Sequence, residues 1–342
     1  MQILLALIAL GALLRLYHLD YTSLWLDEAY TIHFARPTLI QIWQLTTVNG
    51  ECNPPLFHWI EHGMLFFGQS EFVIRIVPAL AGIATIPIFY LIGREFLGIN
   101  VGILAAALLA LSPFHIFYSQ EGRAYTLVLL FVSLALFAYL VALRSDGLYM
   151  WALFAVFSAL AFWTHFYTLI LIALLLLSAL FMPRPDVSRT ARMRGTGVAL
   201  GVFCLLCLPM IPVVVWLFFV RTSVPPTWGS LGLETIPAVA SGFAGDNLLI
   251  VVISTVLLLV GLIELRRRDR AKFLFAAGLL AIPLIISILL STRMPMHPRY
   301  LIYLLPLYFI GISIGLLAAY AAAMRRFQKK QILAAGVALL IL

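Results

Sequence analysis

Residues 1–31 read MQILLALIALGALLRLYHLDYTSLWLDEAYT, an apolar run of helix length followed by two adjacent acids, Asp27 and Glu28. The run lacks the basic start and the small-residue cleavage site of a secretory signal peptide. We therefore expect it to remain attached as a first membrane-spanning helix near residues 2–19. Acids beside a bilayer are costly unless they are used, which makes Asp27 and Glu28 candidate functional residues. The alternative is a solvated loop or a helix cap.

The composition excludes a soluble globular protein. Of the 342 residues, 63% are hydrophobic and 11% are charged, with a mean hydropathy of +1.07. Soluble domains are only about 45–50% apolar. Three cysteines provide no disulfide framework, and Cys204 and Cys207 lie in an apolar run as ordinary helix residues.

Apolar runs of about 17–25 residues recur along the whole chain, each long enough to cross a bilayer as a helix. The predicted spans are 2–19, 73–93, 100–118, 124–143, 148–163, 166–182, 197–219, 247–265, 271–290 and 299–320. A last run, 331–342, is too short to cross, so we expect either that the native chain continues and this sequence is truncated within a helix, or that the helix there is only partial. The sequence predicts an all-α, polytopic integral membrane protein of about eleven transmembrane helices, in one domain over residues 1–342.

Charge placement predicts the orientation of these helices. Alternating the loops puts 15 of the 22 basic residues on one side, which the positive-inside rule makes cytoplasmic. The net charge of +8 then reflects topology and indicates no nucleic-acid binding. The amino terminus is predicted inside, with Arg15 as an exception at the outer end of the first helix. All seven histidines and nine of the fourteen carboxylates fall on the outer side, where we expect the active site.

The connection over residues 20–72 is much longer than a link between helices requires, so it is predicted to have structure of its own. Within it, ARPTLIQIWQLTTVN (35–49) has apolar residues at helical spacing, and PPLFHWIEHGMLFFG (54–68) begins with a proline pair typical of a helix start. Both are predicted to be short helices at the membrane interface.

Two further segments and one arginine concentrate polar side chains at outer helix ends. SPFHIFYSQEGRAYTL (112–127) carries Gln120, Glu121, Arg123 and Tyr125, and STRMPMHPRYLIYLLP (291–306) carries Arg293, His297, Arg299 and Tyr300. Arg75 lies at a third outer end. Guanidinium groups on the side that the positive-inside rule disfavours suggest a bound anion such as a phosphate. An ion pair between Glu121 and Arg123, or a snorkelling arginine, is the alternative.

His165, in WTHFY, lies at a turn between two spans, where a lone histidine is usually a hydrogen-bonded interface residue. A metal site receives less support still. Asp27, Glu28 and several histidines are possible ligands for a divalent cation, but none shows a recognisable ligand spacing.

Five elements in order resemble a known family. They are DE after the first helix, NPPLFHWI (53–60), SEFVIRIVPAL (70–80), YSQEGRAYTL (118–127) and HPRYLIYLLP (297–306). Together they resemble the C-type membrane glycosyltransferases of the family 39-like group, which includes protein O-mannosyltransferases and lipid A aminoarabinose transferases. The resemblance extends over nearly the whole chain.

The resemblance implies an inverting glycosyltransferase that moves a hexose or pentose from a polyprenyl-phosphate donor to a hydroxyl of a lipid, glycan or protein. Asp27 would be the general base and Glu28 would orient it. Donor phosphate would be bound by Arg75, Arg123, Arg299 and Tyr300, with substrate contacts from Gln120, Glu121, Tyr125, His165 and His297. No metal or other cofactor is implied, although a divalent cation stays open. The expected location is a bacterial inner or plasma membrane, with the site on the periplasmic or extracellular face.

The chain departs from the pattern of the resembled family at two places, and two other functions are alternatives. Glu51-Cys52-Asn53 replaces the Glu-Lys that precedes the proline pair of aminoarabinose transferases, which argues against that specificity. The loop 220–246 leaves no room for the repeats inserted in eukaryotic protein O-mannosyltransferases. A transporter or flippase of lipid-linked sugars is the main alternative, but repeated halves and midplane polar sites are not apparent. A non-catalytic membrane assembly subunit would not need Asp27.

Overall fold

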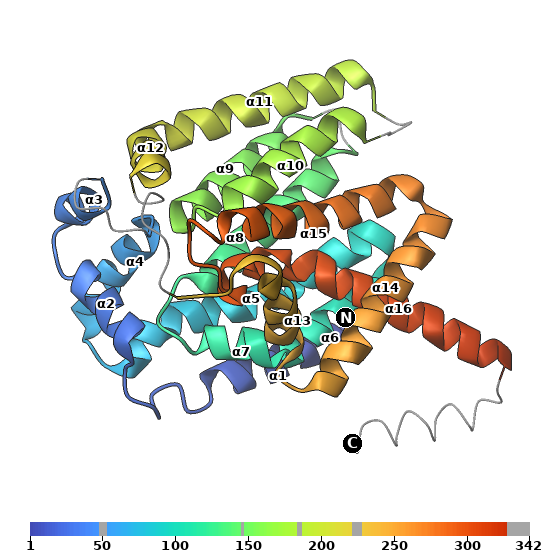
Figure 1. Ribbon diagram of the computed structural model, residues 1–342, viewed down its shortest axis with the longest axis horizontal. Helices are drawn as coiled ribbons and strands as arrows, with labels where there is room; N and C mark the ends of the chain where they lie inside the picture. Colours follow the sequence, from blue (N-terminus) through green and yellow to red (C-terminus); the bar gives the residue numbers. More distant parts are fainter. Residues whose placement is uncertain (48–52, 145–146, 183–186, 221–227, 327–342) are drawn as a thin grey trace.

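The computed structural model describes all residues except 48–52, 145–146, 183–186, 221–227 and 327–342 (Figure 1). The described part of the chain is helical and contains no strand. The predicted partial helix at 331–342 and the departure at Glu51 and Cys52 lie outside the described residues.

Each of the predicted complete spans coincides with a helical segment. These segments are α1 (Gln2–Leu16), α5 (Glu71–Leu97), α6 with α7 (Ile99–Leu111 and Pro113–Ser119), α8 (Tyr125–Ala142), α9 (Tyr149–Thr164), α10 (Thr168–Phe181), α11 with η2 and α12 (Arg189–Cys207, Leu208–Met210 and Ile211–Phe219), α14 (Leu248–Arg268), α15 (Arg270–Leu290), and η5 with α16 (Pro298–Leu304 and Leu305–Arg326). In the described residues, six helices are long and apolar enough to cross a membrane, or seven if the bent pair α6 and α7 is one span. Three shorter apolar helices, α1, α9 and α10, accompany them. The chain is therefore an all-helical integral membrane protein, while the count of eleven spans is not confirmed.

The short helices α2 (Leu26–Ala35), α3 (Leu39–Thr47) and α4 (Leu56–Met64), formed by the long first connection, lie together at one end of the bundle, at the left of Figure 1. The segments 35–49 and 54–68 contain α3 and α4, which is followed by η1 (Leu65–Phe67). Between α12 and α14, η4 (Gly232–Glu234) leads into α13 (Thr235–Ala244). A helix that the sequence did not predict, α2, carries both Asp27 and Glu28 in its first turn.

The predicted straight span at 100–118 is bent by 59° between α6 and α7. Pro113 has no backbone N–H and cannot continue the hydrogen-bond ladder of α6. Arg15, fully buried, donates to the backbone carbonyls of Leu109 (2.9 Å) and Ala110 (3.1 Å) at the end of α6. It also contacts Nδ1 of His115 at 2.7 Å. Arg15, the exception to the predicted charge distribution, is thus a structural residue. It donates hydrogen bonds to the backbone carbonyls at the end of α6, where the helix is interrupted.

The helices α14 and α16 approach each other closely through glycines. A Cβ atom on Gly261 would overlap the carbonyl oxygen of Gly311, and one on Gly315 would overlap the carbonyl oxygen of Leu257. Small residues let helix backbones approach in a bilayer, where packing rather than the hydrophobic effect drives association. This contact places α16, and therefore the η5 segment at its start, against the rest of the bundle.

We expect Gly261→Val to destabilise the protein by about 1–3 kcal/mol or more, because the added atoms force apart two packed backbones. Thermal unfolding of purified protein in detergent measures the effect. Gly201→Val on α11 is the matched control, since a Cβ atom there meets nothing within 4 Å. Equal unfolding temperatures for the two variants would contradict the close crossing.

Candidate active site

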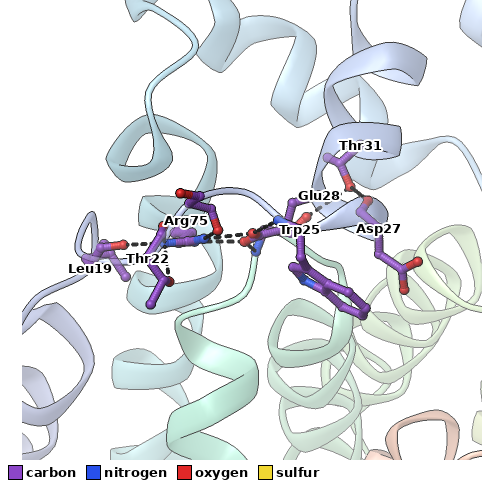
Figure 2. Close-up of polar contacts among 9 residues, drawn as sticks. Leu19, Thr22, Trp25, Asp27, Glu28, Thr31 and Arg75 are labelled. Carbon is purple, nitrogen blue, oxygen red and sulfur yellow. Dashed lines mark hydrogen bonds and ion pairs between the residues drawn. The ribbon is translucent and has the colours of Figure 1, made fainter.

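Glu28 anchors a buried polar cluster at the start of α2 (Figure 2). Its carboxylate accepts hydrogen bonds from the backbone N–H of Trp25 (3.3 Å) and of Gly122 (2.7 Å). Arg75 donates to both carboxylate oxygens, at 2.8 and 2.7 Å. With 1% of its side chain exposed, Glu28 is shielded from solvent. We call Arg75, Glu28 and Gly122 the Glu28 clamp.

Arg75 was predicted to bind the donor phosphate, but the structure engages its guanidinium elsewhere. Besides Glu28, it donates to the backbone carbonyls of Leu19 (3.0 Å), Thr22 (2.9 Å) and Ser23 (3.3 Å). Its side chain is 4% exposed. Such a charge-assisted, bidentate pair is among the strongest of protein hydrogen-bond arrangements. Arg75 therefore holds the segment after α1 in place and does not line the cavity described below, while its role toward a phosphate stays a prediction.

The loop after α7 is fixed onto α2 by a second set of contacts. The Thr31 hydroxyl donates to the carbonyl of Gly122 (2.9 Å), and the Arg123 guanidinium donates to the carbonyl of Asp27 (3.2 Å). A side chain at Gly122 would collide with Ile74. The absence of a Cβ atom is what allows the loop to approach Glu28. Together these contacts place Arg123 beside Asp27.

Asp27 points away from the clamp, as Figure 2 shows, and pairs with Arg299 from η5. The distance between Asp27 Oδ2 and Arg299 Nη1 is 3.2 Å. The Arg299 guanidinium also lies over three aromatic rings, those of Tyr125 (5.4 Å), Tyr300 (5.5 Å) and Trp228 (5.8 Å). Cation–π contacts of this kind hold a guanidinium in place without using its N–H donors.

Asp27 and Arg299 open into a cavity of about 320 Å³. Among the described residues, the cavity is lined by aromatic, apolar and basic side chains and a single acid: Asp27, Tyr30, Phe34, Asn53, Pro54, Arg123, His165, Phe166, Tyr167, Leu217, Trp228, Arg293, Met294, Pro295, Arg299 and Tyr300. Three guanidinium groups face one carboxylate, so the lining carries a net charge of +2 when His165 is neutral. An apolar cavity with a few convergent charged groups is the usual form of a binding site for a small anionic group.

Of the predicted site residues, Asp27, Arg123, His165, Arg299 and Tyr300 line this cavity. His165 is 9% exposed, and burial, with Arg123 and Arg299 nearby, lowers its pKa to about 3. Its imidazole is neutral at pH 7, and Nδ1 accepts from the backbone N–H of Tyr167 at 3.3 Å. His165 can therefore present a neutral ring to a ligand.

The other predicted contacts lie behind the cavity wall. Gln120 donates to backbone carbonyls at the end of α1, and Nδ1 of His297 caps η5 by accepting from the backbone N–H of Arg299 at 3.3 Å. Burial lowers the pKa of His297 to about 4. Tyr125, 3% exposed, packs beneath Arg299. These residues support the site from behind rather than lining it.

Glu121 is 3% exposed, and neither of its carboxylate oxygens has a hydrogen-bond partner in the described part of the chain. The alternative ion pair with Arg123 is not formed between these two described side chains. Burial raises the pKa of Glu121 to about 7, because Arg299 and Arg123 offset the desolvation only in part. Glu121 does not line the cavity, so among the described residues Asp27 is the carboxylate that faces it.

The raised pKa of Glu121 predicts a pH-dependent stability. A carboxyl whose pKa is higher in the folded protein stabilises the fold fully below its unfolded value, and this contribution is lost as the pH rises through about 7. We expect Glu121→Gln, which mimics the protonated acid, to remove that fall in unfolding temperature. Glu61, whose pKa burial raises to about 8, contributes equally to both proteins, so their difference isolates Glu121. Parallel pH profiles would contradict a buried, protonated Glu121.

Several lining residues escaped the sequence interpretation. Tyr30 and Phe34 follow Asp27 by three and seven residues, so recognising α2 as a helix would have placed them on its face. Asn53 lies within a quoted motif but was not assigned to the site, and Arg293 was named among the arginines that suggest a bound anion but not among the donor-phosphate residues. Trp228 shows no signal in the sequence, because its position over Arg299 depends on a backbone contact. There, the N–H of Ser230 donates to the carbonyl of Met296 at 2.9 Å.

No group of three or more His, Cys, Asp or Glu side chains suited to a metal ion occurs among the described residues. Asp27 faces Arg299, and Glu28 is bound by Arg75. The expectation of a reaction without metal stays a prediction.

The chain is similar in part to a known protein family and over most of its length to several solved structures. Residues 52–216 match the family model described as dolichyl-phosphate-mannose-protein mannosyltransferase. No curated protein matches by sequence. Among solved structures, ArnT from Cupriavidus metallidurans in the apo state is 18% identical with a TM-score of 0.63, over 96% of this chain and 60% of that one. ArnT bound to undecaprenyl phosphate is 17% identical with a TM-score of 0.61, over 98% and 63%.

The oligosaccharyltransferase of Archaeoglobus fulgidus is similar as well. It is 15% identical with a TM-score of 0.64, over 97% of this chain and 51% of that one. The chain thus spans about half to three-fifths of the length of these structures. The matches confirm the all-helical membrane fold and the resemblance that the sequence predicted.

Proposed function

We propose that this chain, which has the fold of the C-type membrane glycosyltransferases, transfers a sugar from a polyprenyl-phosphate donor to a hydroxyl acceptor. The observation that carries the proposal is the cavity in which one exposed carboxylate, Asp27, meets three guanidinium groups, those of Arg123, Arg293 and Arg299. Two structural neighbours support the lipid carrier. ArnT was solved with undecaprenyl phosphate, and the archaeal enzyme AglB, 13% identical with a TM-score of 0.60, with a dolichol-phosphate and an inhibitory peptide.

The proposed reaction has one displacement step. The acceptor oxygen attacks the anomeric carbon of the sugar and forms the new glycosidic bond. The bond from that carbon to the phosphate oxygen breaks, and its electron pair leaves with the polyprenyl phosphate. Asp27 takes the proton of the acceptor hydroxyl as the general base. Attack from the face opposite the phosphate would invert the anomeric configuration.

The charge of the cavity suits this step. The donor is a phosphodiester with one negative charge, and the departing polyprenyl phosphate carries two. During the reaction one negative charge therefore moves from Asp27, which becomes protonated, to the leaving phosphate. Arg299, placed 3.2 Å from Asp27, stands where it can interact with both. Preorganised cations at the place where charge develops are usually a large contribution to catalysis.

The proposed roles differ from those expected from the sequence at Arg75 and Arg293, whereas Glu28 keeps its expected role of orienting Asp27. Glu28 and Arg75 are positioning residues of the Glu28 clamp, which holds the first turn of α2 and with it Asp27. The donor phosphate is assigned to Arg123, Arg299 and the additional cavity residue Arg293, with Tyr300 at its side. The sugar, the acceptor class and the periplasmic or extracellular location of the site remain part of the proposal.

The test is to reconstitute the purified protein in vesicles with polyprenyl-phosphate sugars labelled in the sugar. Extracts of the native membrane provide acceptors, and each labelled hexose or pentose is examined in turn. Consumption of one donor with release of unlabelled polyprenyl phosphate and label on a new product supports the proposal. Movement of an intact donor across the vesicle membrane would instead indicate a flippase. If no donor is consumed by folded protein, the proposal fails.

A further inference from the structure

The Asp27 and Arg299 pair is placed where a donor phosphate would have to bind. Both residues line the cavity, and the structure pairs them directly at 3.2 Å. The carboxylate that is to accept a proton is thus occupied by the guanidinium that is to bind the leaving group. The Arg299 guanidinium would therefore have two anionic partners in one cavity, the Asp27 carboxylate and the donor phosphate.

The Arg299 guanidinium is held in place, whereas the described contacts hold Asp27 at its backbone and leave its carboxylate with the Arg299 ion pair. The aromatic rings of Tyr125, Tyr300 and Trp228 hold the Arg299 guanidinium, and its Nε atom is buried without a hydrogen-bond partner in the described part of the chain. Asp27 is fixed through its backbone, whose carbonyl accepts from Arg123. An incoming phosphate would therefore meet Arg299 in place, with the Nη1 donor paired with Asp27.

We propose that Asp27 and the donor phosphate compete for Arg299, so that donor binding releases Asp27 and must precede the use of Asp27 as a base. This inference rests on the proposed function. The phosphodiester of the donor offers two non-bridging oxygens that share one full charge, so it can accept from two donors of a guanidinium, whereas Asp27 meets Arg299 through one carboxylate oxygen. Once the phosphate holds Arg299, the Asp27 carboxylate is released from that ion pair and can accept a hydrogen bond from the acceptor hydroxyl.

The consequence is an ordered reaction, in which the donor-free site keeps its base paired. Paired in this way, Asp27 has one oxygen fewer to offer to an acceptor hydroxyl, so acceptor alone should bind poorly. The same competition predicts that the Asp27 charge weakens binding of the donor phosphate. Removing the charge of Asp27 should destroy transfer and yet strengthen binding of the lipid phosphate.

The experiment measures binding of undecaprenyl phosphate to the full chain in detergent, with undecaprenol as the uncharged comparison. We expect Asp27→Asn to bind undecaprenyl phosphate roughly tenfold more tightly than wild type, a coupling typical of groups in direct contact. In an Arg299→Gln background, the same Asp27→Asn change should alter affinity by less than about twofold. In an Arg123→Gln background the tightening should persist. Asp20→Asn is the matched control, because Asp20 is exposed and outside the cavity.

The outcomes separate the competing explanations. Tightening that survives in Arg299→Gln would indicate a through-space charge effect and overturn the exchange of partners. Unchanged or weaker binding by Asp27→Asn, with an unfolding temperature like that of wild type, would overturn it as well, because Arg299 would then bind both partners at once. If wild type binds undecaprenyl phosphate no better than undecaprenol, the proposed function fails, and not this inference alone.

Discussion

Replacing Asp27 by asparagine should lower the rate of sugar transfer by about a thousandfold or more, which corresponds to the loss of a positioned general base. Asparagine keeps the size of the side chain and cannot take a proton from the acceptor. The N-terminal turn of α2 should keep its conformation, because Glu28 and not Asp27 bonds to the backbone of Trp25. Turnover of a labelled donor under saturating conditions measures the effect.

Asp27→Glu retains the charge and tests the position of the base. The longer side chain moves the carboxylate by about one bond length, and misplacements of about 1 Å cost up to about a hundredfold in rate. Asp20→Asn should transfer at the wild-type rate, since Asp20 lies outside the cavity. Near wild-type turnover in folded Asp27→Asn protein would remove Asp27 from the mechanism.

Much of the fold was accessible from the sequence because the membrane imposes a simple rule, namely that each apolar run long enough to cross must be a helix. Two features required more than hydropathy. The bend at Pro113 depends on Arg15, which is distant in sequence and satisfies the end of α6. The helix α2, LDEAYTIHFA, has no clear apolar stripe and is held by contacts from other elements, so periodicity alone did not reveal it.

The site was predicted in the same uneven way. Charged residues at the outer ends of spans indicated Asp27, Arg123 and Arg299 correctly as neighbours of one cavity. The same reasoning could not separate Arg75 from them, because an arginine that binds a phosphate and one that binds a buried acid look alike in sequence. The pairing of Arg75 with Glu28, 47 residues apart, is a property of the folded chain. The burial and the hydrogen-bond partners of each arginine, rather than its residue type, decide which one can bind a ligand in the cavity.

Arg75→Met should destabilise the protein by about 3–5 kcal/mol, since it leaves the Glu28 carboxylate buried without its charged partner. The unfolding temperature in detergent measures the loss. Arg36→Met is the matched control, because Arg36 donates to Gln69 in an exposed hydrogen bond, and the change there should stay within about 1 kcal/mol. The double variant Arg75→Met with Glu28→Leu should recover part of the loss, because no buried charge is then left unpaired.

The same variant separates a positioning role from a binding role for Arg75. If Arg75 holds the Glu28 clamp, folded Arg75→Met protein should lose turnover as Asp27 shifts, while its affinity for undecaprenyl phosphate changes by less than about threefold. An arginine that contacts the phosphate would behave in the opposite way, with a large loss of lipid affinity and a nearly unchanged unfolding temperature. That second result would return Arg75 to the phosphate site and would show that the Glu28 pair opens when the donor binds.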